Sequence, residues 1–225
     1  MQVVIAGGHG KVALRLTWRL RERGDAVRSL IRDPAHEEDV RAAGAEPVLC
    51  DLEAAAPEEV ARVVGPADAV VFAAGAGPGS GPDRKWTVDY GGAVKLIAAA
   101  QANRIRRYVM LSSIRADPEA EGDDAFAVYL RAKGRADAEL RASGLHHTIV
   151  RPAFLSDDPG SGRVVVAERV DHEARISRDD VAAVLAACLH EPATIGLTFE
   201  VAAGDVPVEE ALSRFAAAAS RPIAR

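Results

Sequence analysis

Short apolar runs alternate with segments of helical periodicity along almost the whole chain. Runs of strand length lie at residues 2–6, 26–31, 47–50, 67–73, 107–111, 147–150, 164–167 and 197–201. Between them, apolar residues recur every three or four positions, as expected for helices with one buried face; these segments cover residues 11–23, 35–43, 57–64, 83–103, 126–143, 177 onward and 208–218. The alternation predicts an α/β fold with a mostly parallel sheet and helices on both faces. The right-handed crossover rule then favours a doubly wound Rossmann fold.

Residues at the expected helix ends support these boundaries. Gly24 and Gly44 follow two of the helical segments, where a glycine commonly ends a helix. Ser177 and Asp180 have the spacing of a capping box at the start of another. A cluster of basic side chains before the strand at residues 107–111 is expected to serve the helix dipole and solubility; it comprises Arg104, Arg106 and Arg107.

A glycine-rich turn joins the first strand to the first helix. Gly7, Gly10 and Ala13 fit the pattern G-x-x-G-x-x-A. Glycines let the backbone approach a pyrophosphate, and the free N–H groups at a helix start hold the anion. The strand–turn–helix setting favours this interpretation over a tight turn without a ligand. It predicts a dinucleotide site with ligands Gly7, His9, Gly10, Lys11 and Val12.

The end of the second strand bears on the choice of cofactor. Arg32 stands where an acidic residue would select NAD by binding the ribose, and a guanidinium suits a phosphate instead. NADP(H) is therefore the predicted cofactor; NAD(H) would be favoured if the strand ended one residue later, at Asp33. Asp51, with Leu52 beside it, could meet the adenine edge or could cap a surface helix.

Tyr129 and Lys133 lie four residues apart on one face of a predicted helix. An ammonium group near a phenol lowers its pKa, which suits a tyrosine that acts as a general acid toward a carbonyl oxygen. The same lysine could hold a nicotinamide ribose. A solvent-facing lysine beside a core tyrosine is the alternative.

Two serines end the strand at residues 107–111. Ser113 is the preferred partner of Tyr129 for orienting a substrate oxygen, and Ser112 is the alternative. Both could instead simply end the strand. Leu111, the residue before them, is expected to contact the cofactor.

Together, these motifs resemble the atypical short-chain dehydrogenase/reductase superfamily, and more narrowly its small NAD(P)H-binding members related to NmrA-like proteins and to biliverdin-IXβ and flavin reductases. Further stretches with this resemblance are residues 72–75, 88–93, 149–152 and 176–182. The resemblance implies a Rossmann fold in which Ala73, Ala74 and Gly75 line the adenosine-ribose side. It also implies that Arg151, Pro152 and Ala153 flank the nicotinamide, and that residues after Phe154 help form a substrate lobe.

Length and composition fit one soluble domain. We expect residues 1–225 to form a single unit, with a cofactor-binding core at 1–150 and with 151–225 adding a small substrate lobe, the last strand and the last helices. A net charge of −5 disfavours nucleic-acid binding. Cys50, Cys188 and the histidines show no metal-ligand spacing, so no metal is expected. The start lacks a secretory signal and no apolar run could span a bilayer, which predicts a cytoplasmic protein with no membrane partner.

The resulting hypothesis is an NADP(H)-dependent reductase that transfers hydride to a small carbonyl, quinone or flavin-like acceptor. A redox sensor that binds NAD(P)H without turnover is the alternative, with the glycine-rich segment at residues 75–82 as a moving element. A nucleotide-sugar epimerase or dehydratase is a third interpretation, which the short C-terminal part disfavours. Alanine-rich faces of the helices at residues 83–103 and 126–143 would allow a homodimer.

Overall fold

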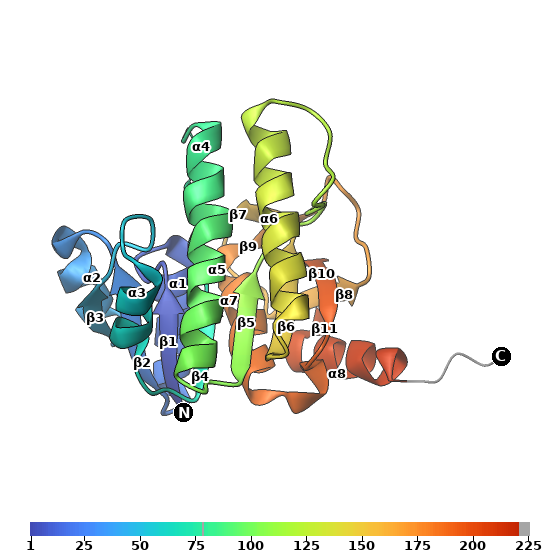
Figure 1. The fold of residues 1–225 in the computed structure, drawn as a ribbon. Helices are drawn as coiled ribbons and strands as arrows, with labels where there is room; N and C mark the ends of the chain where they lie inside the picture. Colours follow the sequence, from blue (N-terminus) through green and yellow to red (C-terminus); the bar gives the residue numbers. More distant parts are fainter. Residues whose placement is uncertain (78, 221–225) are drawn as a thin grey trace.

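The computed structural model describes residues 1–77 and 79–220 (Figure 1). Within them, nine strands form one sheet in the order β11-β8-β10-β6-β5-β4-β1-β2-β3. β8 runs antiparallel to β10 and β11, and the other neighbours are parallel. The predicted fold class is confirmed. The strands are β1 Gln2–Ala6, β2 Ala26–Ile31, β3 Glu46–Leu49, β4 Ala69–Phe72, β5 Arg107–Leu111, β6 His146–Pro152, β8 Arg163–Ala167, β10 Thr198–Ala203 and β11 Val206–Pro207.

Helices cover both faces of the sheet because successive strand residues point to opposite sides. In β1, Val3 packs in one buried cluster and Val4 in the other. The first cluster contains buried residues of four helices: α1 Lys11–Glu22, α2 Glu37–Ala42, α7 Arg178–His190 and α8 Val208–Ala219. The second cluster contains buried residues of α3 Pro57–Val64, α5 Gly91–Ala102 and α6 Ala125–Ala142. These three helices lie in front of the sheet in Figure 1.

The long helix expected at residues 83–103 is three consecutive pieces. It begins with the short α4, Pro82–Arg84, continues as a π-helical segment, η2 Lys85–Tyr90, and ends as α5. A π-helix widens the turn and shifts which side chains face inward, and such turns are frequent at functional sites. Here Lys85 and Asp89 are both buried.

Several other elements differ from the predicted ones in their bounds or were not predicted. β6 begins one residue before and ends two residues after the predicted strand, so residue 150 lies inside it. β7 Phe154–Ser156 and β9 Arg175–Ser177 form a small parallel sheet of their own that was not predicted. Two short 3-10 turns, η1 Pro34–His36 and η3 Pro192–Thr194, also lie outside the predicted helices or at their ends.

Ser177 caps the start of α7, at the position that the spacing of Ser177 and Asp180 predicted. The Ser177 hydroxyl accepts a hydrogen bond from the backbone N–H of Asp180 at 2.9 Å. The Asp180 carboxylate in turn accepts from the N–H groups of Ser161 at 3.1 Å and Gly162 at 2.7 Å. One buried acid therefore both supports the helix start and anchors the loop after β7.

Arg107 does not have the solvent-exposed role that was expected of it. Its side chain is buried and donates to Thr148 Oγ1 at 2.8 Å, to the carbonyl of His146 at 2.8 Å and to the carbonyl of Cys188 at 2.5 Å. It also donates to Thr194 Oγ1 at 3.1 Å. Arg107 therefore ties β5 and β6 to the end of α7.

The two edges of the sheet are short strands that each contain a proline. Pro47 lies in β3 at one edge, and Pro207 ends β11 at the other. Among the residues that the structure describes, no helix is long and apolar enough to cross a membrane.

Candidate functional site

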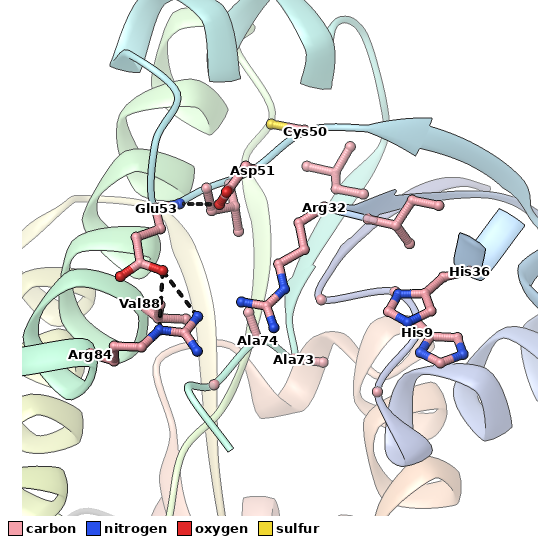
Figure 2. Close-up of a pocket in the computed structure, with 17 residues that line it drawn as sticks. His9, Arg32, His36, Cys50, Asp51, Glu53, Ala73, Ala74, Arg84 and Val88 are labelled. Carbon is pink, nitrogen blue, oxygen red and sulfur yellow. Dashed lines mark hydrogen bonds and ion pairs between the residues drawn. The ribbon is translucent and has the colours of Figure 1, made fainter. Parts of the chain in front are cut away.

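A cavity of about 240 Å³ opens at the carboxyl ends of the first four strands (Figure 2). β1 and β4 are neighbours, and the chain winds outward from them in opposite directions. Ligands of open α/β sheets bind at such a switch point. The cavity is lined by Gly7, Gly8, His9, Gly10, Leu30, Ile31, Arg32, His36, Cys50, Asp51, Leu52, Glu53, Ala73, Ala74, Gly75, Arg84 and Val88.

The glycine turn is packed too tightly for side chains at its first two positions. A Cβ added to Gly7, whose φ is +79°, would lie 2.5 Å from the Cα of Ala74. One added to Gly8 would lie 2.4 Å from the Cβ of Ser29. Gly8 was not part of the predicted motif, although its place beside Gly7 was visible in the sequence. Glycine therefore lets this turn rest directly on the ends of β4 and β2.

The start of α1 offers backbone donors to an anion. Leu14 N–H donates to the carbonyl of Gly10 at 2.9 Å, which closes the first helical turn. The N–H groups of Lys11, Val12 and Ala13 precede it, where a helix has no internal acceptors. This end of the cavity therefore fits the phosphates of a dinucleotide.

Nine of the predicted cofactor-binding residues line this cavity, and seven do not. Those that line it are Gly7, His9, Gly10, Arg32, Asp51, Leu52, Ala73, Ala74 and Gly75. Those that do not are Lys11, Val12, Leu111, Lys133, Arg151, Pro152 and Ala153.

The side chains of Lys11 and Asp51 are both engaged with the protein. Lys11 Nζ lies 2.6 Å from Asp157 Oδ2, on the loop after β7, so it does not point into the cavity. Asp51 Oδ1 accepts from the N–H of Glu53 at 2.9 Å. Asp51 thus caps the turn after β3 while also lining the cavity, so both of its predicted roles remain open to it.

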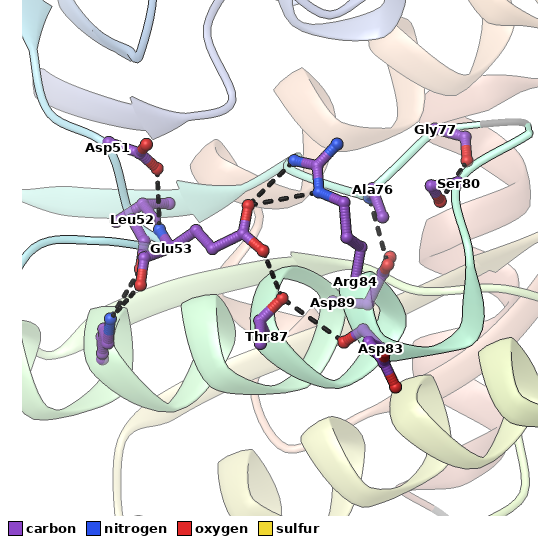
Figure 3. A network of polar contacts seen from close by, with 11 residues as sticks. Asp51, Leu52, Glu53, Ala76, Gly77, Ser80, Asp83, Arg84, Thr87 and Asp89 are labelled. Carbon is purple, nitrogen blue, oxygen red and sulfur yellow. Dashed lines mark hydrogen bonds and ion pairs between the residues drawn. The ribbon is translucent and has the colours of Figure 1, made fainter.

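A polar network holds the wall of the cavity opposite the glycine turn (Figure 3). Glu53 accepts from Arg84 Nη2 at 3.0 Å and from the Thr87 hydroxyl at 2.5 Å. These contacts, the Thr87 bond first, lower the pKa of Glu53. Lys95 Nζ donates to the carbonyl of Leu52 at 2.8 Å. The loop after β3 is therefore fixed to the helix that begins at α4.

Lys133 belongs to a second group of polar residues, which lies where β4 and β5 end. Its buried Nζ is 3.4 Å from Asp89 Oδ1, 3.3 Å from the carbonyl of Leu111 and 3.4 Å from that of Ala74. Burial would lower the pKa of this ammonium, but Asp89, Tyr129 and Asp137 outweigh burial and raise it. Lys133 therefore carries a positive charge, paired with a carboxylate that sequence reasoning did not assign to the site.

Tyr129 faces both Lys133 and Ser113. The Lys133 Nζ lies 5.9 Å from the centre of its ring, and the Lys85 Nζ lies 5.6 Å from it. Burial raises the pKa of Tyr129, Asp89 and Asp137 add to the rise, and Lys133 and the Ser113 side chain oppose it. The expectation of a lowered pKa is wrong, because burial and the two carboxylates outweigh the lysine.

Ser112 and Ser113 point to different surroundings. The Ser112 hydroxyl is buried and donates to Asp137 Oδ2 at 2.9 Å. Asp137 also accepts from Arg151 Nε at 2.9 Å. Burial raises the pKa of Asp137, although Arg151 and Ser112 oppose the rise. Ser113 is half-buried beside Tyr129, so the structure groups Ser113, and not Ser112, with the phenol.

Sequence reasoning missed two buried carboxylates of the site, Asp137 and Asp89, and only the spacing of Asp137 was visible in the sequence. Asp137 follows Lys133 by four positions on α6, as Lys133 follows Tyr129, and all three lie on one helix face. Asp89 gave no such signal, because it faces inward on the π-helical segment. Its other oxygen accepts from the N–H of Ala76 at 3.1 Å.

Comparison with known proteins agrees with this geometry. Residues 7–192 match the model of a family described as NAD(P)H-binding. The uncharacterized sugar epimerase YhfK of Bacillus subtilis is 38% identical over 215 residues, covering 95% of this chain and 100% of that protein.

Two solved structures are also similar over nearly their whole length. One, named as a candidate NAD-dependent epimerase/dehydratase of Bacillus halodurans, has a TM-score of 0.87 and 37% identity, covering 95% of this chain and 99% of the other. The oxidoreductase ylbE of Lactococcus lactis has a TM-score of 0.84 and 28% identity, covering 95% and 96%. This chain therefore belongs to the family described as NAD(P)H-binding, and it has the Rossmann fold.

Proposed function

We propose that this protein is an NADP(H)-dependent oxidoreductase that reduces a small carbonyl, quinone or flavin-like acceptor. The observation that carries the proposal is the grouping of Tyr129, Ser113 and Lys133 where β4 and β5 end, beside the nucleotide cavity. A phenol, a hydroxyl and an ammonium are the groups that protonate, orient and balance charge at a carbonyl oxygen.

When bound, NADPH supplies a hydride to the electrophilic atom of the acceptor. Tyr129 would transfer its O–H proton to the acceptor oxygen and then regain a proton from solvent. Its raised pKa keeps the phenol protonated at neutral pH, as a proton donor requires. Ser113 would donate a hydrogen bond to the same oxygen. Lys133 would stabilise the transient phenolate.

The preference for NADP(H) is supported by the end of β2. Arg32 is exposed and extends into the cavity (Figure 2). Asp33, the residue that would favour NAD(H), accepts from the N–H of Ala35 at 2.9 Å and so caps the η1 turn. It is not among the cavity-lining residues.

NADPH oxidation by the purified protein against a panel of quinones, flavins, dyes and small carbonyls tests this proposal. Tyr129→Phe is expected to lower kcat by about 100-fold or more, the range for loss of a general acid. Tyr90→Phe is the matched control, because it removes a phenol that contacts Glu139 instead. Equal turnover in the two variants would refute the assignment of Tyr129.

A second candidate is supported by the names of the relatives, two of which are called epimerases. An epimerase returns its hydride, so it would convert a nucleotide sugar without net consumption of NADPH. Chromatography of nucleotide sugars incubated with the protein separates the two functions. Tight binding of NADPH with neither activity would favour a redox sensor, which also needs different affinities for the two redox forms.

A further inference from the structure

A second lysine lies beside the phenol of Tyr129 and has no part in the mechanism given above. Lys85 is on the π-helical segment η2 and is 8% exposed. Its Nζ is 5.6 Å from the centre of the Tyr129 ring, about as close as the Nζ of Lys133, at 5.9 Å. The same phenol is therefore accompanied by two ammonium groups, one from its own helix α6 and one from η2.

A backbone carbonyl orients the Lys85 ammonium. Lys85 Nζ donates to the carbonyl of Gly77 at 2.9 Å, and the Ser80 hydroxyl donates to the same oxygen at 2.9 Å. Four residues further along η2, Asp89 accepts from the N–H of Ala76 at 3.1 Å (Figure 3). Two neighbouring residues of the segment after β4 are thus bound to η2, which fixes the Lys85 side chain in the site.

The other charged groups around the phenol form two pairs. Lys133 Nζ lies 3.4 Å from Asp89 Oδ1, and Arg151 Nη2 lies 2.8 Å from Asp137 Oδ2. Each buried carboxylate of the site thus has a cation of its own. Within the described part of the chain, Lys85 donates to an uncharged carbonyl and has no carboxylate within ion-pair distance. Lys85 is therefore the cation in excess.

Proton transfer from the phenol creates a negative charge at a buried position. If only the two pairs were present, the phenolate would be uncompensated, and an unpaired buried charge is costly to hold away from water. With Lys85 included, the group carries one net positive charge before the transfer and none after it. A charge that is already in place when the reaction begins stabilises the developing charge without reorganisation.

We propose that Lys85 is a further residue of the proton-transfer step, where it compensates the charge of the Tyr129 phenolate while Lys133 is held by Asp89. This deepens the proposed function and rests on it. The proton passes from the Tyr129 oxygen to the acceptor oxygen, and the electron pair of the O–H bond stays on the phenolate. Lys85 keeps all of its protons, and the phenolate later regains one from solvent.

The experiment measures the ionisation of Tyr129 in the full chain, without cofactor or acceptor. Difluorotyrosine replaces the three tyrosines, because ring fluorines lower the pKa of a phenol and their ¹⁹F signals report its ionisation. The titration is thereby moved toward a range in which a lysine, with an ordinary pKa of about 10.4, is still charged. The signal that is lost in Tyr129→Phe is the signal of Tyr129.

Three variants separate the charge of Lys85 from its hydrogen bond. Lys85→Gln removes the charge and keeps a donor for the Gly77 carbonyl, Lys85→Met removes both, and Lys85→Arg keeps the charge. Lys95→Met is the matched control, because the Lys95 ammonium also donates to backbone carbonyls, but to those of the loop after β3. Thermal melts show whether each variant is folded.

Loss of the Lys85 charge is expected to disfavour the phenolate. Lys85→Gln and Lys85→Met should lower the ionisation constant of Tyr129 by about tenfold to a hundredfold, the range for a unit charge about 6 Å away in a partly desolvated site. Lys85→Arg should keep the constant within about threefold of that of the unmodified protein. Lys95→Met should leave it unchanged.

Kinetics then separate this inference from the proposed function. With an acceptor whose turnover depends on Tyr129, Lys85→Gln should lower kcat by about tenfold. An unchanged titration in both charge-removing variants, an equal change in Lys85→Arg, loss of the fold in both charge-removing variants, or an unchanged kcat would overturn the inference and leave the proposed function standing. The expected titration without NADPH turnover on any acceptor would overturn the proposed function and, with it, the role of Lys85 in proton transfer.

Discussion

Replacing Lys133 with methionine tests the buried charge pair at the centre of the site. The side chain of Lys133 is 4% exposed and that of Asp89 is 1% exposed. Asp89 Oδ1 has no hydrogen-bond donor among the described residues, so removing the ammonium takes away its paired positive charge and leaves the carboxylate oxygen buried and uncompensated. Loss of one partner of a buried pair costs about 3–5 kcal/mol. The Nζ–Oδ1 distance of 3.4 Å is long, so we expect the lower end of that range.

Lys133→Met is therefore expected to lower the free energy of unfolding by about 3 kcal/mol. For a domain of this size, that corresponds to a fall in Tm of about 6–12 °C. Adding Asp89→Asn removes the stranded charge, and the amide oxygen can still accept from Ala76. The double variant should therefore regain about 2 kcal/mol. Urea unfolding and calorimetry at pH 7 measure all three proteins. A double variant no more stable than Lys133→Met would refute the view that charge pairing holds these residues together.

Three further changes have defined outcomes. Gly134→Ala should lower the free energy of unfolding by about 1–3 kcal/mol, because the added Cβ would lie 2.2 Å from the Asp117 carbonyl carbon. This steric cost should outweigh the higher helix propensity of alanine. A urea midpoint higher than that of the unmodified protein would contradict the prediction. Arg107→Met should cost at least about 3 kcal/mol in urea unfolding, whereas the exposed control Arg106→Met should change stability by less than about 0.5 kcal/mol. Glu53→Gln should cost about 0.5–1 kcal/mol at pH 7. Because the pKa of Glu53 is lowered on folding, that gap in stability is present above its ordinary value of 4.5 and should close as the pH falls below it, as thermal melts would show; a constant gap would exclude the charge as its cause.

Periodicity was sufficient to predict the central strands, because most of their residues are buried and apolar. β1, β2 and β5 have the predicted bounds for this reason. The glycine turn was predictable because strand, turn and helix follow one another directly. The small β7–β9 sheet was not, since its strands are three residues each and pair across a long loop.

Side-chain direction was the harder part of the site. The π-helical turn at Lys85–Tyr90 inserts no visible break in the apolar pattern, yet it helps to turn Asp89 inward toward Lys133. Arg107 was misjudged because its charge suggested solvent, whereas its acceptors come from residues 39 to 87 positions away. Local sequence does not show such distant partners. The motif pair Tyr129 and Lys133 was visible because it lies within one helix.

The prolines at the two edges of the sheet bear on how copies of this protein can associate. An exposed strand edge is a template for pairing with another chain, and proline lacks the N–H group that such a ladder needs. β11 has only two residues and ends in Pro207, and β3 has four and includes Pro47. Joining two molecules into one continuous sheet is therefore disfavoured at either edge. A homodimer of this protein, which remains a prediction, would be expected to form through its helices.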